Sequence, residues 1–544
     1  MARADAVSGR AGPPAGAQRR RSVRAAGVLA GLAAAVSAVA PASATTIGRG
    51  FTLEEATIAS THAAMRAGRI TCRGLVQGYL RRITRHENDL NALIAVNGRA
   101  LRAASSLDIR YRRGGFTGPL HCAPVLVKDN YDTADLPTTA SSRSLAGSQP
   151  PDDATTVRKL RRAGAIVLAK ANLTEFALTG ITFGSLGGQT RNPYDLTRTP
   201  GGSSGGTGAG LAANFALLGT GTDTVNSIRS PSSANSLVGI RPTAGLVSRD
   251  GIVPVSSTQD VAGPIARTVT DAATMLAVMD GYDPADPISA RSIGNLQSSY
   301  RDELEQDALV GARIGVFTSF LGTDPALHGE VNTVVTGAGR AMRREGAKVV
   351  PVALERVSAN GLIADLDVQR FEFKTVMNAY LAGFAAPKRS LAEIVASGEY
   401  DPQFGTFLRL ANSIPNGLEE PEYRARLVRI QAFRDRVLRL MADNDLDALV
   451  YPQQQRLVVP IGEDQVDRNG IMAAVTGFPS VTVPAGFSPP KPTAPRGVPV
   501  GLEIFGRPFD EQKLIRYAFD FEQATRHRRQ PASTPSLPDP RSSD

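Results

Sequence analysis

The chain has 544 residues, of which 42% are hydrophobic and 21% are charged, a composition that is ordinary for a globular protein with a large core. This composition excludes a disordered, fibrous or multi-pass membrane chain. The two cysteines and five histidines are scattered without Cys-x-x-Cys or His-x-x-x-His spacing, which argues against a structural zinc site and a disulfide-rich scaffold.

The formal net charge of +10 is concentrated at the start of the chain, where residues 1–44 contain six arginines and one acidic residue. A basic run ending in RRRSVR, an apolar stretch over 25–40 and the tripeptide Ala42-Ser43-Ala44 form the pattern of an export signal cleaved after about Ala44. We therefore expect an extracellular or cell-envelope protein, exported by the twin-arginine or the Sec route, without stable membrane insertion after cleavage. A retained membrane helix is the alternative. The charge that remains is too modest to indicate a nucleic-acid partner.

The two cysteines, Cys72 and Cys122, could oxidise outside the cytoplasm. Their spacing does not show whether they meet. We expect two separate free thiols.

Helical and strand-length apolar patterns alternate along the chain. Helices are expected over 75–83, where Leu75, Tyr79 and Ile83 recur at helical spacing, over 154–163, and from Thr207 to Leu218. The alternation predicts an α/β fold with a large mixed β-sheet covered by helices. The predicted strands are 123–127, 165–169, 313–317, 348–352, 446–450, 480–483 and 500–505.

Residues 45–527 are expected to form a single domain. Within it, 285–445 is a variable region that turns mostly helical from about residue 355, either as part of a substrate cap or as one more packed layer. The Pro- and Ser-rich end, 528–544, is predicted to be disordered.

The densest chemical signal is the glycine-rich loop over 199–206, TPGGSSGG. It lacks the Gly-Lys-Ser/Thr ending of a phosphate-binding loop, which excludes that kind of nucleotide site. Gly202, Ser204 and Gly206 also match the Gly-x-Ser-x-Gly elbow of α/β hydrolases, so an esterase-type serine hydrolase is one alternative. That alternative needs a downstream histidine, and only His328 and His527 follow.

A serine hydrolase can use lysine in place of histidine as its base, and the chain has only eight lysines against 53 arginines. One of them, Lys128, directly follows the apolar run in PVLVKDN. A lysine at the end of a buried strand either extends to water or stays neutral with a lowered pKa. The second state is a competent general base.

A third segment, GTGTDTVNSIRSP over 219–231, completes a resemblance to the amidase signature family of serine hydrolases. The family has a lysine in P-V-x-V-K-D-N, a G-G-S-S-G-G loop and a nucleophilic serine in G-T-D-x-G-G-S-I-R-x-P. This chain has Lys128, Ser203 and Ser227 at those places, at intervals of 75 and 24 residues that agree with the family. Further matching stretches extend the resemblance over about 55–525, and the downstream text looks somewhat like bacterial peptide amidases.

The resemblance implies the amidase signature fold and hydrolysis of a carboxylic amide to carboxylate and ammonia or amine, with no metal or organic cofactor. Ser227 would attack the carbonyl, and Ser203 would relay its proton to neutral Lys128. The relay serine would follow a cis peptide bond from Gly202, and Ser204 would donate a supporting hydrogen bond. The oxyanion would rest on the backbone N–H groups of Thr224, Val225, Asn226 and Ser227.

One departure from the family lies directly before the nucleophile, where Val225-Asn226 replaces the usual two glycines. Asn tolerates the left-handed region better than any other non-glycine residue, and valine is poorly suited to it. We expect Asn226 to keep the unusual backbone conformation and Val225 to remain extended. Asp223 and Arg229, which flank the loop, are expected to brace it by ion pairing rather than to act on substrate.

The expected partner is a small-molecule or peptide amide substrate, and the expected oligomeric state is a monomer or a homodimer. The family also includes an amide-forming subunit that works on charged transfer RNA, which an export signal argues against. A non-catalytic amidase-like binding protein is a further alternative, although all three catalytic positions are intact.

Overall fold

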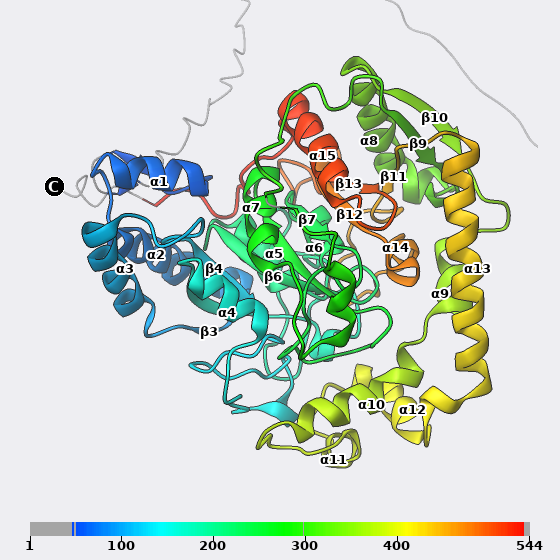
Figure 1. Ribbon diagram of the computed structural model, residues 1–544, viewed down its shortest axis with the longest axis horizontal. Coiled ribbons are helices and arrows are strands. Elements are labelled where there is room, and N and C mark those ends of the chain that lie inside the picture. The colour runs from blue at the N-terminus through cyan, green and yellow to red at the C-terminus, as the bar shows by residue number, and fades with distance from the viewer. Residues whose placement is uncertain (1–45, 48–49, 298, 538–544) are drawn as a thin grey trace, which may run out of the picture. The chain divides into compact units, whose positions relative to one another are not determined.

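An eleven-stranded mixed β-sheet runs through the part of the chain that the computed structural model describes, residues 46–47, 50–297 and 299–537 (Figure 1). Parallel strand pairs lie on both sides of a central antiparallel group, and the edge strand at one end is antiparallel to its neighbour. This arrangement confirms the predicted α/β class. From one edge to the other the strands are β10 (Lys348–Val352), β9 (Arg313–Phe317), β11 (Ala448–Pro452), β13 (Pro499–Phe505), β12 (Ser480–Phe487), β7 (Val238–Arg241), β8 (Val261–Ala266), β6 (Leu218–Asp223), β4 (Pro124–Lys128), β5 (Ile166–Ala171) and β3 (Leu93–Val96); β1 (Thr46–Ile47) and β2 (Phe51–Thr52) form a separate pair.

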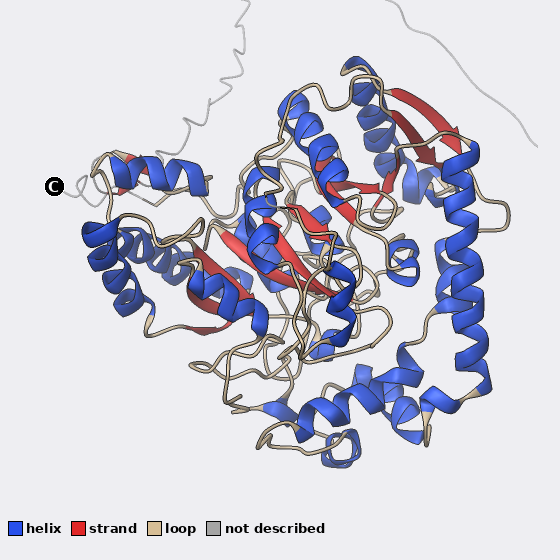
Figure 2. Cartoon of the chain, viewed as in Figure 1, coloured by secondary structure: helices blue, strands red, loops and turns tan. Residues whose placement is uncertain are grey.

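Helices surround the strands of the large sheet, as Figure 2 shows with helices in blue and strands in red. Many helices begin with a side chain that accepts a hydrogen bond from the first turn, such as Thr71 before α2 and Asp324 before α8. The helices are α1 (Ile58–Arg66), α2 (Cys72–Leu90), α3 (Ala100–Gly114), α4 (Thr155–Arg162), α5 (Gly205–Ala212), α6 (Arg229–Ala234), α7 (Val269–Met279), α8 (Pro325–Arg344), α9 (Ala359–Leu366), α10 (Gln369–Ala382), α11 (Leu391–Ser397), α12 (Pro402–Ser413), α13 (Pro421–Asp443), α14 (Ile471–Thr476) and α15 (Glu511–Thr525), with short 3₁₀ turns at Arg143–Leu145, Glu175–Ala177, Pro287–Ser292, Thr318–Phe320 and Gly417–Glu419.

The seven predicted strands all occur, with ends shifted by no more than a few residues. The helix expected from Thr207 to Leu218 is wrong in its extent, because α5 ends at Ala212 and Leu218 already begins β6. Strand β6 reads LGTGTD, and the many small and polar residues hide its strand character in the sequence. Strand β6 is stabilised by its pairing with β8 and β4 rather than by the strand propensity of its own residues.

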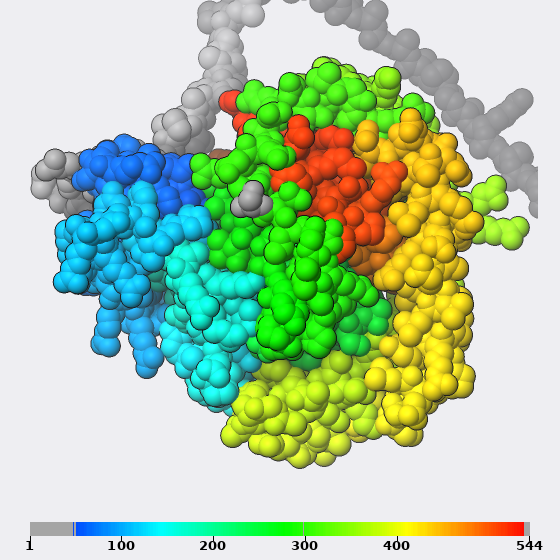
Figure 3. Space-filling model, viewed as in Figure 1, coloured from blue at the N-terminus to red at the C-terminus, as the bar shows by residue number. Residues whose placement is uncertain are grey.

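Residues 359–443 form five helices, α9 to α13, in agreement with the mostly helical region expected there. In the space-filling view this segment, coloured yellow-green to yellow, lies along the lower and right margins of the visible face (Figure 3). Its buried side chains include Phe371, Phe433 and Val437, which pack in one apolar cluster with Val225, two residues before Ser227. The helical region therefore reaches the segment that was predicted to be catalytic.

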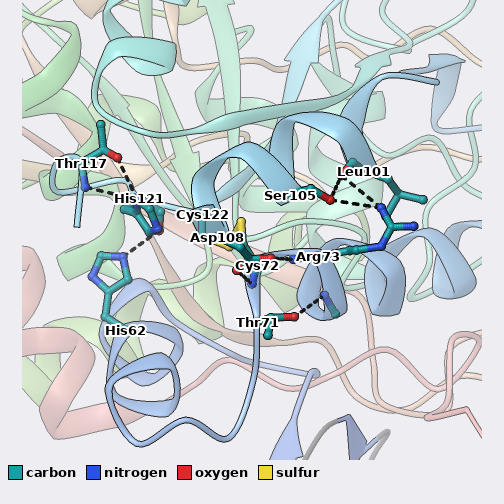
Figure 4. Close-up of a disulfide and its surroundings, with 11 residues drawn as sticks. His62, Thr71, Cys72, Arg73, Leu101, Ser105, Asp108, Thr117, His121 and Cys122 are labelled. Atoms are coloured by element: carbon teal, nitrogen blue, oxygen red, sulfur yellow. Dashed lines mark hydrogen bonds between the residues drawn. A yellow bond between two sulfur atoms is a disulfide. The ribbon is translucent and has the colours of Figure 1, made fainter. Parts of the chain in front are cut away.

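The prediction of free thiols is wrong, because Cys72 and Cys122 form a disulfide with their Cα atoms 5.5 Å apart (Figure 4). Cys72 is the first residue of α2, and its backbone N–H donates to Asp108 Oδ1 on α3 at 2.7 Å. Cys122 lies two residues before β4. The pairing is a tertiary contact across 50 residues, which spacing alone could not show.

The prediction of a disordered end is also wrong for residues 528–537. Arg528 forms an ion pair with Glu55 at 2.7 Å, and the Thr534 and Pro535 carbonyls accept hydrogen bonds from the buried Arg82. Hydrogen bonds between the backbone of this segment and buried side chains keep it ordered, although its composition suggests disorder. Residues 538–544 lie outside the described part of the chain.

The predicted export signal, residues 1–44, also lies outside the described residues. Among the residues that are described, no helix combines the length and apolar character needed to cross a membrane. The described residues from 46 onward belong to one compact unit.

Candidate active site

The predicted base lies where two neighbouring parallel strands end. Lys128 is the last residue of β4, and the adjacent β6 ends at Asp223. The carboxyl ends of parallel strands meet at one edge of a sheet, where ligand sites commonly lie. This topology brings the lysine next to the segment that carries Ser227.

The Lys128 ammonium group is completely buried and is surrounded by hydroxyl groups. Nζ lies 2.8 Å from Ser203 Oγ and 2.7 Å from Thr222 Oγ1. Burial lowers the pKa of Lys128 to about 7, although the carboxylates of Asp223 and Asp260 partly oppose the shift. A large fraction of this lysine is therefore neutral near pH 7 and able to accept a proton.

Ser203 is held by the glycine-rich loop directly before α5. The Gly202–Ser203 peptide bond is cis, as the resemblance implied. A Cβ at Gly202 would lie 2.7 Å from the Gly180 carbonyl carbon, so only glycine fits there. Ser204 Oγ donates to the Thr222 carbonyl at 3.4 Å, and its backbone N–H donates to the Ser227 carbonyl at 3.2 Å. The loop thus contacts both the lysine and the Ser227 segment.

The segment around Ser227 is braced by buried charges, as the sequence predicted for Asp223 and Arg229. Arg229 Nε donates to Asp223 Oδ2 at 3.0 Å, and the Ile228 N–H donates to the same oxygen. Arg241 donates to Asp223 Oδ1 at 2.8 Å. Burial alone would raise the pKa of Asp223, but Arg229 and Arg241 hold it well below its usual range. The network fixes the turn between β6 and α6.

The prediction of a left-handed backbone conformation at Asn226 is wrong, because neither Val225 nor Asn226 has a positive φ. The turn needs no glycine conformation at these two positions, which is why both can carry side chains. Within the described part of the chain, no group accepts a hydrogen bond from the backbone N–H of Thr224, Val225, Asn226 or Ser227. Four consecutive free donors form the kind of cradle that stabilises an oxyanion.

A small cavity of about 40 Å³ opens beside Ser227, which is 4% exposed. It is lined by the 224–227 segment, by 177–179, by Ile363 of α9, and by three polar residues that sequence reasoning missed. These are Asp367, Gln369 and Arg468. They come from segments far away along the chain, and no local motif marks them.

A second and larger cavity, of about 500 Å³, is also lined by Thr224. Its walls include Asn130, Thr222, Asp260 and Tyr380 of α10. Asp260 Oδ1 accepts a hydrogen bond from Thr224 Oγ1 at 2.6 Å and its Oδ2 accepts from two backbone N–H groups, which anchors the start of the 224–227 segment. Thr222 and Asp260 are further positioning groups that the sequence did not single out.

The Gly-x-Ser-x-Gly alternative finds no support in the geometry around Ser204. Its hydroxyl donates to a backbone carbonyl, whereas His328 contacts Asp324 and His527 lies against Phe521. In the described ranges, no group of three or more His, Cys, Asp or Glu side chains is arranged to hold a metal ion.

Comparisons with known proteins give one consistent result. Residues 74–515 match the family model described as Amidase. A probable amidase of Arabidopsis thaliana is 34% identical over 518 residues, covering 92% of this chain and 95% of the relative. A glutamyl-tRNA(Gln) amidotransferase subunit of Halorhodospira halophila is 35% identical over 500 residues, covering 87% and 98%. The solved structure of the peptide amidase from Stenotrophomonas maltophilia is 38% identical with a TM-score of 0.80, covering 88% of this chain and 98% of that one.

Proposed function

Since this chain belongs to the amidase signature family, we propose that it hydrolyses linear carboxylic amides to a carboxylate and ammonia or an amine. Ser227 is the nucleophile, Ser203 the proton relay and Lys128 the general base. The observation that carries the proposal is the buried Lys128 Nζ, 2.8 Å from Ser203 Oγ, with its pKa lowered to about 7.

The reaction begins with two proton transfers. Ser227 Oγ attacks the amide carbonyl carbon while its proton passes to Ser203 Oγ, and the Ser203 proton passes to the neutral Lys128 amine. The negative charge on the carbonyl oxygen is stabilised by the free N–H groups of the 224–227 segment. One such donor contributes about 3–4 kcal/mol in hydrolases where it has been removed.

The C–N bond then breaks and the leaving nitrogen takes a proton from Ser203, which is replenished from Lys128. The acyl group remains as an ester on Ser227. A water molecule attacks this ester, and the same relay accepts the water proton and returns one to Ser227. The carboxylic acid leaves and loses its proton to water to become the carboxylate, and the lysine is again neutral, so no cofactor enters the balance.

We also propose that the enzyme works outside the cytoplasm. The sequence of residues 1–44 has the pattern of an export signal, and the Cys72–Cys122 disulfide is of a kind that persists in oxidising compartments. A chain exported in this way would not meet charged transfer RNA, which favours hydrolysis over the amidotransferase activity named for one set of relatives.

The test uses the full chain without partner proteins, incubated with aliphatic, aryl and peptide amides while ammonia or amine release is followed. We expect release by the unaltered protein and a loss of about 10³-fold or more for Ser227→Ala. Ser230→Ala is the matched control, because the Ser230 hydroxyl is buried but has no hydrogen-bond partner. Unchanged hydrolysis by Ser227→Ala would reject the mechanism, and activity that appears only with partner proteins would favour an amidotransferase.

A further inference from the structure

The cavity beside Ser227 contains a buried amide group that lacks a partner. Asn226 is 1% exposed and lines this cavity, and its Nδ2 has no hydrogen-bond acceptor. Its Oδ1 lies 3.5 Å from an Arg468 guanidinium nitrogen, which orients the amide. A buried donor without an acceptor is costly, so a group that supplies an acceptor here gains binding free energy.

The side chain of Asn226 has little freedom to turn away from the cavity. A Cβ at Gly470, directly before α14, would lie 2.5 Å from Asn226 Cβ, so the two backbones already pack closely. Helices α9 and α14 contact each other on this side of the molecule (Figure 1). The backbone that carries the unpartnered amide is therefore closely packed against the start of α14.

Arg468 is the second donor in the same cavity, where its side chain is partly exposed and contacts Asn226 Oδ1. Burial lowers its pKa, which Asp367 and Asp464 partly oppose, and among the described residues Arg468 forms no ion pair. Asp367 lines the cavity too, but Gln369 Nε2 donates to both of its oxygens at 3.0 Å. The guanidinium group thus remains available to an incoming anion.

We propose, on the basis of the function proposed above, that Arg468 and Asn226 bind a carboxylate on the acyl part of the substrate. Asn226 directly precedes Ser227, so only a short chain can separate the carboxylate from the scissile carbonyl. The substrate class is then the monoamide of a short dicarboxylic acid, with the scissile amide at Ser227 and the free carboxylate between the two donors. The replacement of the usual Gly-Gly by Val225-Asn226 supplies one of these donors.

Three amide substrates distinguish the effect of the carboxylate charge from that of the shape of the acyl chain: succinamate, the neutral ketone 4-oxopentanamide, and butyramide. For the full chain we expect kcat/KM for succinamate to exceed that for 4-oxopentanamide by about thirtyfold or more, since the carboxylate pairs with Arg468 and accepts a hydrogen bond from the buried Asn226 amide. Arg468→Met should abolish this preference, so that the ratio of the succinamate to the 4-oxopentanamide kcat/KM falls to about one. Asn226→Ala should reduce succinamate hydrolysis about tenfold.

Asp367→Asn should have the opposite effect, because removal of a negative charge from the cavity should lower KM for succinamate relative to that for butyramide. Equal kcat/KM values for succinamate and 4-oxopentanamide, or an unchanged preference in Arg468→Met, would overturn the proposal.

Calorimetric binding of succinamate to Ser227→Ala, with and without Arg468→Met, tests the carboxylate site independently of turnover. Binding that depends on Arg468 supports the site even if no amide is hydrolysed, and in that case only the proposed function fails. Hydrolysis of butyramide together with Arg468-independent binding of succinamate rejects the site and leaves the proposed function intact.

Discussion

Lys128 is the residue on which the proposed chemistry depends. Its side chain is completely buried at the end of β4, and desolvation brings its pKa to about 7 despite the nearby carboxylates. Below that pH the lysine is protonated and cannot accept the Ser203 proton. Above it the neutral amine predominates, so the base is active near neutral pH.

Activity should therefore fall as the pH is lowered below the pKa of Lys128. We expect kcat/KM of the unaltered enzyme to rise with pH along a limb with an apparent pKa of about 7 and then to level off. Lys128→Met should lower kcat/KM by about 10²–10⁴-fold and remove this limb. Lys348→Met, at an exposed position in β10, is the control and should keep the limb. An identical limb in Lys128→Met would show that another group titrates.

At the scale of elements, helix α5 positions the relay serine by packing against strand ends rather than by a side-chain cap. The N-terminal N–H groups of Gly205 and Gly206 donate to Thr182 Oγ1 and to the Asn172 carbonyl. A Cβ at Gly206 would lie 2.3 Å from the Asn172 carbonyl oxygen and 2.4 Å from that of Ala92. Glycine is needed here for a close approach of two backbones.

Gly206→Ala should destabilise the protein by about 3 kcal/mol or more and displace Ser203, since the clash is with backbone atoms that cannot move independently. Gly329→Ala is the matched control within α8, where an added Cβ meets nothing within 4 Å. It should be neutral or stabilise by up to about 1 kcal/mol. Urea unfolding midpoints, with the slope compared, measure both effects. Equal midpoints for the two variants would contradict this account of the packing.

At the scale of the whole molecule, two long-range connections hold the N-terminal helices to the sheet. The disulfide joins the start of α2 to the segment before β4, and the 528–537 segment contacts Arg82 and Glu55. Arg82 is fully buried and forms an ion pair with Glu54 at 2.6 Å, so removal of its carbonyl partners would leave part of a buried charge unsatisfied.

Replacement of both cysteines by alanine should lower the free energy of unfolding by about 4 kcal/mol, the chain-entropy value for a closed loop of 50 residues. A reducing agent should lower the midpoint of the unaltered protein to a similar extent and leave that of the double variant unchanged. The comparison is made by urea unfolding with and without dithiothreitol. Activity at 25 °C should change little, because neither cysteine contacts the candidate active site. A midpoint of the unaltered protein that is insensitive to reductant would argue against the disulfide as a stabilising link.

The sequence predicted those parts of the site that lie within continuous motifs. Lys128 and the two serines each stand in a short stretch that resembles a motif of the amidase signature family, and that resemblance implied their roles and the cis bond at Gly202. Arg468, Asp367 and Thr222 were not predicted. Their roles depend on which distant segments pack together in the fold, and the residues next to them in the sequence do not indicate this packing.

The sequence by itself determined the α/β class, the positions of the apolar strands and the identity of the candidate catalytic residues, because strand periodicity and motif chemistry are local properties. Only the tertiary structure decided that Cys72 meets Cys122, that the Gly- and Thr-rich 218–223 segment becomes a central strand, that residues 528–537 are ordered, and that Asn226 shares a cavity with Arg468. Each of these outcomes depends on contacts between residues far apart in the chain, where burial and hydrogen-bond satisfaction outweigh local propensity.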